Sequence, residues 1–264
     1  MPIYAEALGV RAMAESADGI LWFGTTKRGL YEYRDGRLNQ YTIEHGLAAN
    51  SVNDLCLAND GKLWIACAGG GLSVYDGEVF QRLSREDGLP HDAVRRVVQD
   101  DAGDLWLATD SSVVRYQPRQ RSPKVRITQV TTDRIYADTD DIIFAGKPKR
   151  LAFDFLGVSL TTHPDGMVYS CRLQGVHDYW EPVYGSQREY LHDQLPYGSH
   201  AFEVRAVDRD LNYSEPARVE FRIRPAYGQI ALVGGFGVTL IGAIAATFIA
   251  FRHRLERNRA LVAQ

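Results

Sequence analysis

Asp18-Gly19-Ile20-Leu21-Trp22-Phe23-Gly24-Thr25 is the stretch that decides the fold, because the chain repeats it twice. It returns as Asp60-Gly61-Lys62-Leu63-Trp64-Ile65-Ala66-Cys67 and then as Gly103-Asp104-Leu105-Trp106-Leu107-Ala108-Thr109. The tryptophans stand at positions 22, 64 and 106, so the interval between them is the same each time. A period of about 42 residues, built from short apolar runs and glycine turns, is typical of β-propeller blades of about four strands each.

Residues downstream of each tryptophan recur in the same register. A Gly-Leu-x-x-Tyr element stands at residues 29–33 and again at 71–75, and Asp-Gly pairs follow at 35–36 and 76–77. Asp-Gly between two apolar runs indicates a β-hairpin, because both residues of such a turn adopt positive φ. A Gly-Leu pair then closes the unit. We expect each tryptophan to lie on an inner strand and to pack between neighbouring blades as a structural residue.

These units resemble the two-component regulator propeller repeats found in the sensing regions of bacterial transmembrane receptors. The resemblance rests on the Asp-Gly-x-Leu-Trp core, the Gly-Leu-x-x-Tyr element and the trailing Gly-Leu pair, and it covers about residues 5–118. The third unit departs from the pattern, since Val113-Val114-Arg115-Tyr116 replaces its Gly-Leu-x-x-Tyr element. We predict that residues 1–118 form three blades of a partial propeller.

Three blades are fewer than the roughly four to eight with which propellers close. Two interpretations are open: the chain is the C-terminal part of a longer sensor, or blades from several chains combine. We favour the first.

The next hundred residues read as a second β-domain. Lys124–Val130 alternates polar and apolar residues, as a half-buried strand does. Further candidate strands, each bounded by turn residues, follow at 141–145, 150–155, 167–173, 201–207 and 217–223. About seven short strands over this length are typical of an immunoglobulin- or fibronectin-like β-sandwich, which we place at residues 124–224.

This region resembles the three-tyrosine domain that follows such propellers. The similarity is carried by residues 168–175, Trp180, Arg188-Glu189-Tyr190 and the stretch 195–206. His200 stands where that family usually has its third tyrosine. We expect the aromatic side chains to alternate into the core of the sandwich.

An uncharged run of 22 residues at 230–251 predicts one transmembrane helix, since at about 1.5 Å per residue it spans a hydrocarbon core of about 30 Å. Four arginines at 252–259 place the following side in the cytoplasm. Residues 252–264 have the spacing of the start of a coiled coil. The β-domains are then periplasmic, in a single-pass protein of the bacterial inner membrane. Small residues in the helix permit the homodimer that we expect.

No residue pattern indicates a catalytic, cofactor or metal site. A net charge of −3 gives no reason to expect a nucleic-acid partner. The three cysteines, an odd number without Cys-x-x-Cys spacing, are interpreted as inert core thiols: Cys56, Cys67 and Cys171. None of the histidines has a ligand spacing; they stand at 45, 91, 163, 177, 192, 200 and 253.

Two further patterns are interpreted as turns. Gly69-Gly70-Gly71 is not followed by the Lys-Ser/Thr and helix that a phosphate loop needs. The acidic residues Asp100-Asp101 and those at 138–141 lack the ligand alternation of a calcium loop, so we expect solvated turn carboxylates. We predict no cofactor, and the ligand-binding residues stay unknown.

The leading hypothesis is the extracytoplasmic sensor and membrane-spanning portion of a bacterial receptor. It passes ligand binding to a cytoplasmic output domain outside this chain, which the resemblance implies to be a histidine kinase or a diguanylate cyclase. The chain itself is then not an enzyme, and the resemblance suggests an extracytoplasmic carbohydrate ligand. Because the N-terminus has no signal peptide, we expect a fragment of a larger receptor.

Two alternatives belong to other functional classes. The first is a membrane-anchored protein-interaction scaffold without signalling output. The second, an extracytoplasmic propeller enzyme such as a lyase, has no supporting residues.

Overall fold

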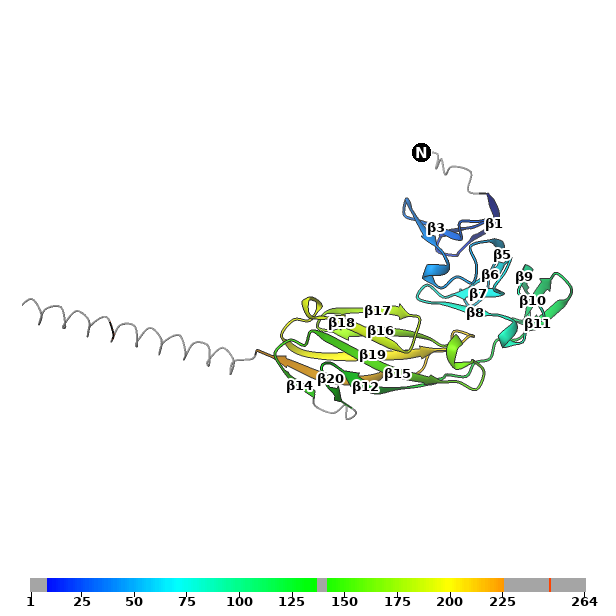
Figure 1. Ribbon diagram of the computed structural model, residues 1–264. Helices are drawn as coiled ribbons and strands as arrows, with labels where there is room; N and C mark the ends of the chain where they lie inside the picture. The colour runs from blue at the N-terminus through cyan, green and yellow to red at the C-terminus, as the bar shows by residue number, and fades with distance from the viewer. Residues whose placement is uncertain (1–8, 137–141, 226–246, 248–264) are drawn as a thin grey trace, which may run out of the picture.

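The sequence repeat becomes a row of antiparallel sheets in the computed structural model, which describes residues 9–136, 142–225 and Thr247 (Figure 1). Blade 1 contains β1 (Val10–Glu15), β2 (Leu21–Thr25), β3 (Leu30–Arg34) and β4 (Arg37–Tyr41). Blade 2 contains β5 (Val52–Leu57), β6 (Leu63–Cys67), β7 (Leu72–Tyr75) and β8 (Phe80–Leu83). Blade 3 contains β9 (Val94–Gln99), β10 (Leu105–Thr109) and β11 (Val113–Tyr116).

The expectation of about four strands per unit is therefore wrong for blade 3. Its fourth strand would fall on the residues after Tyr116, where Pro118 and Pro123 stand. Proline has no backbone N–H to donate to a ladder, so this segment links the blade to the next domain instead of pairing.

Two of the three repeat tryptophans pack between blades as predicted. Trp22 is buried, and its ring centroid lies 5.8 Å from that of Tyr75 in blade 2. Trp64 is buried too, with its ring centroid 6.1 Å from that of Tyr116 in blade 3. The prediction is wrong for Trp106, which is 39% exposed on the outer side of blade 3.

The Gly-Leu pairs close short 3₁₀ turns. Gly46 ends η1 (Ile43–His45) with φ 97°, and Gly88 ends η2 (Arg85–Asp87) with φ 102°. Only glycine adopts this left-handed backbone without strain. The leucine that follows each glycine is buried in the propeller core, so each pair reverses the chain and fixes the start of the next blade.

The second half is a sandwich of two sheets. One sheet has the order β13-β12-β15-β18, with β12 (Lys124–Thr131), β13 (Ile135–Tyr136), β15 (Arg150–Val158) and β18 (Gln187–Leu191). The other has the order β14-β20-β19-β16-β17, with β14 (Ile142–Ala145), β16 (Val168–Gln174), β17 (His177–Val183), β19 (Gly198–Val207) and β20 (Ala217–Arg224). β14 and β20 pair in parallel.

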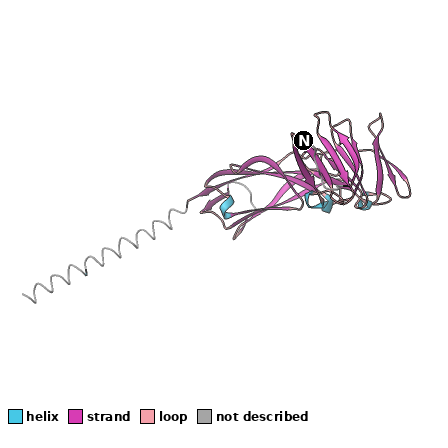
Figure 2. Cartoon of the chain, turned by 90° about the horizontal axis from the view of Figure 1, so that it is seen from above, coloured by secondary structure: helices cyan, strands magenta, loops and turns pink. Residues whose placement is uncertain are grey.

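The predicted all-β fold is confirmed for the described residues, with differences in detail. The six strands expected in the sandwich are present within a few residues of their predicted bounds, whereas β13, β17 and β18 were not predicted. Two 3₁₀ turns, η3 (Pro164–Gly166) and η4 (His192–Gln194), connect strands. Viewed from above, the sandwich extends to one side of the blades (Figure 2).

Aromatic side chains fill the space between the two sheets, as expected. Phe153 and Phe202 stack with ring centroids 4.0 Å apart. Tyr169 and Tyr190 lie in the same buried cluster. His200 is also buried, with Nε2 2.9 Å from the Pro196 carbonyl oxygen. These residues therefore belong to the core.

Among the residues that the structure describes, no helix is both long and apolar enough to cross a membrane. The predicted transmembrane helix at 230–251, apart from Thr247, lies outside the described residues. The predicted coiled coil at 252–264 and the acidic residues at 138–141 lie outside them as well.

Candidate functional site at the junction of propeller and sandwich

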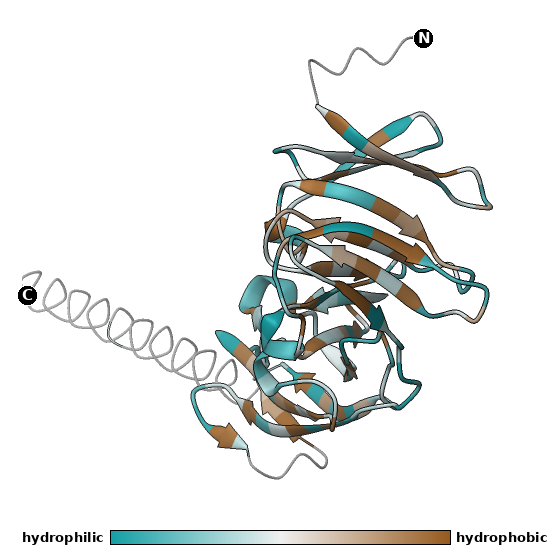
Figure 3. Cartoon of the chain, turned by 90° about the vertical axis from the view of Figure 1, so that its right-hand side faces the viewer, coloured by the Kyte–Doolittle hydropathy of each residue, from teal (hydrophilic) through white to brown (hydrophobic). Residues whose placement is uncertain are grey.

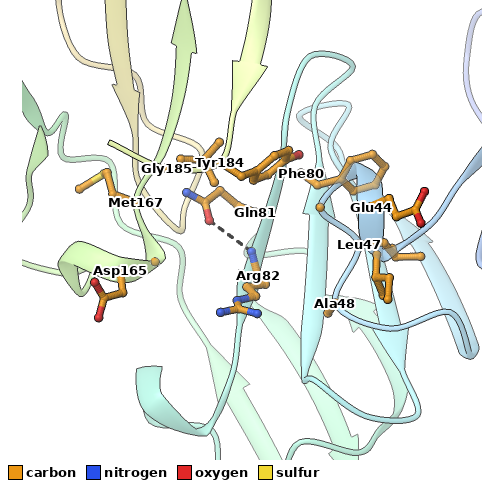
Figure 4. Close-up of a pocket in the computed structure, with 14 residues that line it drawn as sticks. Glu44, Leu47, Ala48, Phe80, Gln81, Arg82, Asp165, Met167, Tyr184 and Gly185 are labelled. Atoms are coloured by element: carbon orange, nitrogen blue, oxygen red, sulfur yellow. Dashed lines mark hydrogen bonds between the residues drawn. The ribbon is translucent and has the colours of Figure 1, made fainter. Parts of the chain in front are cut away.

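A cleft of about 570 Å³ lies where the propeller meets the sandwich (Figure 4). The propeller side is formed by the turn around η1 and by β8. The sandwich side is formed by the η3–β16 segment and by the turn between β17 and β18. Figure 4 shows side chains from both sides facing the same space, and the polar and aromatic ones are Glu44, Phe80, Gln81, Arg82, Asp165 and Tyr184.

Two hydrogen bonds join the domains beside this cleft. Gln81 is buried, and its Nε2 donates to the carbonyl oxygen of Val207 at 2.7 Å. The hydroxyl of Tyr184 donates to the carbonyl oxygen of His45 at 2.6 Å. Gly46 leaves room for this tyrosine, because a Cβ on it would lie 2.2 Å from the Tyr184 oxygen. The repeat glycine thus also serves the interface between domains.

The second part of the junction, here called the Arg205 cluster, consists of Asp76, Glu78, Trp180, Arg205 and Tyr213. The Arg205 guanidinium lies 3.9 Å from the Trp180 ring centroid and 4.6 Å from the Tyr213 ring centroid. It also forms a 2.5 Å ion pair with Glu78 of the blade 2 hairpin. An arginine between two aromatic faces gains cation–π attraction in addition to the ion pair. This geometry ties β19 of the sandwich to blade 2.

Asp76 of the same hairpin makes a second link. Its Oδ2 accepts a hydrogen bond from the Tyr213 hydroxyl at 2.6 Å. Burial, together with this bond to a carboxylate, raises the pKa of Tyr213 above its usual range. The tyrosine therefore stays a neutral donor at physiological pH.

The third part of the junction is the loop from Asp208 to Asn212. Leu211 has φ 60°, an uncommon value for a residue with a side chain. It is buried in the apolar cluster formed by blades 2 and 3. The buried Asp208 carboxylate holds the loop by accepting hydrogen bonds from the backbone N–H groups of Asp210 (3.0 Å) and Asn212 (2.9 Å). A shared apolar cluster therefore joins the two domains, beside the separate core of the sandwich.

The structure locates the cysteines and the glycine run that the sequence analysis named. Cys67 and Cys171 are buried, Cys56 is half-buried, and all three are free thiols. Gly70 and Gly71 have positive φ in a turn, as predicted. Within the described ranges 9–136 and 142–225, no group of three or more His, Cys, Asp or Glu side chains could hold a metal ion.

Asp100 lies at a turn and is partly exposed, as expected, but its carboxylate also has three hydrogen-bond donors around it. Its Oδ1 accepts from the backbone N–H groups of Ala102 (3.0 Å) and Asp104 (2.9 Å), and its Oδ2 accepts from the Trp106 indole at 2.7 Å. The indole bond, followed by these backbone bonds, holds the pKa of Asp100 below its usual range. It is therefore a structural carboxylate of blade 3.

Sequence reasoning missed the junction residues on the blade 2 hairpin, although a signal was present. The Asp-Gly pair at 76–77 stands one position earlier than a strict repeat of the pair at 35–36 would place it. In blade 1, Asp35 and Gly36 both have positive φ, as predicted for a tight hairpin. In blade 2, only Gly77 has positive φ, and Asp76 Oδ1 accepts from the N–H groups of Glu78 (2.9 Å) and Val79 (3.0 Å). The shifted pair makes a wider turn that presents Asp76 and Glu78 to the sandwich.

Comparison with solved structures gives distant similarities. The extracellular domain of a protein named as the hybrid two component system BT3049 from B. thetaiotaomicron is 17% identical, with a TM-score of 0.39; 84% of this chain and 39% of that one are covered. The extracellular domain of BT4673, named as a one component system of the same organism, is 14% identical with a TM-score of 0.37, covering 82% and 44%. Virginiamycin B lyase from Staphylococcus aureus is 13% identical with a TM-score of 0.33, covering 84% and 73%.

At these identities and TM-scores, the activities of these proteins do not carry over to this chain. The chain spans about two fifths of the length of the two extracellular domains. No curated protein matches it. The three-tyrosine resemblance of its sandwich half stays a prediction.

The propeller half does have a family match. Residues 46–69 and 88–111 match the family described as two component regulator propeller. Each matched segment begins at a Gly-Leu pair and runs through the first two strands of a blade. Two of the three sequence repeats, those of blades 2 and 3, therefore match two-component regulator propeller repeats.

Proposed function

We propose that this chain is the extracytoplasmic sensor and membrane-spanning portion of a bacterial signal-transduction receptor. The observation that carries the proposal is the Arg205 cluster, in which the blade 2 hairpin holds β19 of the sandwich. β19 pairs along most of its length with β20, and β20 ends at Arg224, just before the predicted transmembrane helix. A shift of blade 2 is thereby transmitted to the strand that leads to the membrane.

The cleft at the junction is the proposed ligand site. A ligand that contacts Arg82 on the propeller and Asp165 on the sandwich would favour one relative position of the two domains, which is the requirement for a sensor. The cleft offers an aromatic surface on Tyr184 next to carboxylates and a guanidinium. This combination suits a polar, polyhydroxylated molecule such as a carbohydrate. The role is binding, with signalling output supplied by a cytoplasmic domain.

Ligand binding can be tested on the full chain in detergent by calorimetric titration with a panel of neutral and acidic oligosaccharides. At least one is expected to bind, and Tyr184→Ala is expected to weaken that binding by about tenfold, the cost of one lost aromatic contact. Tyr179→Ala is the control, because Tyr179 is exposed on β17 and does not line the cleft. Equal weakening in both variants would place the ligand elsewhere.

Orientation in the membrane is tested by reporter fusions. Alkaline phosphatase, which folds only outside the cytoplasm, is expected to be active when fused after Arg224 and inactive when fused after Gln264. The opposite pattern refutes the proposed topology. The fusions are best made in the complete gene, so that export does not depend on this chain alone.

Coupling between the domains is tested with Glu78→Gln, which removes the charge that faces Arg205. Hydrogen exchange of β19 and β20 is expected to respond to the oligosaccharide in the unaltered chain and much less in the variant. Glu189→Gln is the matched control, because the Glu189–Arg150 ion pair at 2.9 Å lies entirely within the sandwich. If both variants keep the response, the Arg205 cluster does not transmit the signal.

A further inference from the structure

A second pocket, with a volume of about 750 Å³, lies at the end of the sandwich that points away from the propeller. Its described lining residues all belong to the sandwich: they come from the β12–β13 hairpin, from β14 and from the segment that leads into β15. Figure 1 shows β14 and β20 together at this end, and Figure 3, seen from the side of the blades, shows the blades stacked above the sandwich. We call this cavity the β14 pocket.

The β14 pocket is basic. Its described lining contains four basic residues and one acidic residue, which are Arg134, Lys147, Lys149, Arg150 and Asp133. Arg150 forms an ion pair with Glu189 at 2.9 Å. No carboxylate within the described ranges 9–136 and 142–225 forms an ion pair with Arg134, Lys147 or Lys149. The described lining therefore has a net positive charge, which attracts an anion.

Apolar and aromatic side chains lie exposed beside these charges. Ile143 lines the pocket from β14 and is 52% exposed. Tyr197 is 54% exposed, and its ring centroid lies 5.1 Å from Lys147 Nζ. Tyrosine and lysine both have an apolar body and a polar tip, which suits them to the boundary between lipid and water. The pocket thus combines an anion-binding lining with a rim that fits the headgroup region of a bilayer.

β14 is joined to the strand that leads toward the predicted transmembrane helix. It pairs in parallel with β20, with Ala145 opposite Arg224, and the Gly146 N–H donates to the Arg224 carbonyl oxygen at 2.7 Å. Residues 225–229 alone separate Arg224 from the predicted span at 230–251. A chain of that length reaches about 20 Å at most when fully extended. A bilayer that holds the span therefore lies close to the β14 pocket.

We propose that the β14 pocket binds the phosphate-bearing headgroup of an anionic phospholipid and so docks the sandwich on the bilayer surface. This inference rests on the membrane span of the proposed function. The lipid phosphate supplies the negative charge that no described carboxylate provides to Arg134, Lys147 and Lys149. Docking fixes the height of β20 above the membrane, so that a movement passed along β19 and β20 acts on the span instead of tilting the whole sandwich.

Photocrosslinking tests whether the pocket contacts lipid. The full chain, with the photoreactive p-benzoylphenylalanine in place of Ile143, is placed in nanodiscs of phosphatidylcholine alone or mixed with phosphatidylglycerol. Irradiation is expected to give a covalent phosphatidylglycerol adduct, detected by mass spectrometry. The same replacement of Leu160 is the matched control and is expected to give no adduct, because Leu160 is also exposed but follows the end of β15 that is opposite to Arg150.

The crosslinking outcomes separate this inference from the one on which it rests. A chain that enters the nanodiscs but gives no lipid adduct at position 143 overturns the docking of the β14 pocket and leaves the span intact. A chain that enters neither kind of nanodisc overturns the proposed span and the docking with it.

Hydrogen exchange in the same nanodiscs tests the role of charge. The amides of residues 142–150 are expected to exchange at least about fivefold more slowly with phosphatidylglycerol than without it, since one basic residue near an anionic bilayer contributes about that factor in affinity. Lys147→Gln/Lys149→Gln is expected to abolish the difference. Lys124→Gln/Arg126→Gln is the matched control and is expected to keep it, because these exposed residues carry the same charge toward the other end of β15, where Lys124 pairs with Val158.

Two results of the exchange experiment overturn the proposal. The first is equal exchange in the two kinds of nanodisc, or an equal loss of the difference in both double variants. The second is the same protection in phosphatidylcholine nanodiscs when inorganic phosphate replaces chloride at constant ionic strength, which would make the pocket a site for free phosphate instead of lipid.

Discussion

Replacement of Gly46 by alanine separates the role of this glycine in the repeat from its role at the junction between the domains. Gly88 is its counterpart in the next repeat, and the two have nearly the same backbone, with φ 97° and φ 102°. An alanine at either position is strained by about 1–2 kcal/mol because of the left-handed backbone. This part of the loss in stability is expected to be equal in Gly46→Ala and Gly88→Ala.

The surroundings of the two glycines differ. A Cβ at Gly46 would lie 2.2 Å from the Tyr184 oxygen and 2.4 Å from its Cζ, whereas a Cβ at Gly88 would have no atom within 4 Å. The tyrosine ring must therefore move away in Gly46→Ala. Its hydrogen bond to His45 is then lost, at a cost of about 1 kcal/mol. Because Tyr184 is already 46% exposed, loss of its remaining burial costs about 1 kcal/mol more.

Gly46→Ala is therefore expected to destabilise the chain by about 2 kcal/mol more than Gly88→Ala. Urea unfolding of the full chain, followed by tryptophan fluorescence, measures both losses. In a Tyr184→Ala background the difference between the two glycine variants is expected to disappear, since the clashing side chain is gone. Equal losses in the single variants, or a difference that persists without Tyr184, would refute the reasoning.

Three further outcomes follow from burial in the two cores. Trp64→Ala is expected to cost about 3–5 kcal/mol of unfolding free energy, measured by urea, because the indole is buried between blades. Tyr169→Phe is expected to cost about 1–2 kcal/mol in the same assay, since the Tyr169 hydroxyl accepts a hydrogen bond from a buried backbone N–H, and no loss would contradict that role. Burial raises the pKa of Cys67 to about 11 and that of Cys171 to about 12, so both stay protonated and unreactive at pH 8. Maleimide labelling read by mass spectrometry is therefore expected only at Cys56 in the native chain and at all three after urea; native labelling of Cys171 would contradict the buried site.

The blades could be predicted because their information is local and repeated. Each unit carries its own strands and turns, and any position can be checked against its counterpart in the next repeat. The prediction that every repeat tryptophan packs between blades was wrong for Trp106. A repeat specifies which side chain faces the next blade, but not what the described chain places there. The prediction also missed β17 and β18, because exposed polar residues such as Asp178 and Glu189 interrupt a clean apolar alternation there.

The junction could not be predicted from local pattern. Arg205 and Glu78 lie far apart in the sequence, and neither stands out by type or spacing. The one sequence signal was the Asp-Gly pair at 76–77, whose shift by one position indicated a turn different from that of blade 1. The partner of that turn depends on how the sandwich docks, which follows from the packing of Leu211 and its neighbours into the cluster of blades 2 and 3.

The sequence by itself thus determined the repeat, the β-rich class of both halves and the lack of a catalytic or metal-binding pattern. These properties are set by side-chain periodicity and by the backbone demands of glycine, which act over a few residues. Tertiary structure alone decided that Trp106 and Met13 are exposed, that Tyr184 packs against Gly46, and that Arg205 pairs with the blade 2 hairpin. Those contacts join residues far apart in the chain, and their geometry exists only once the domains have packed together.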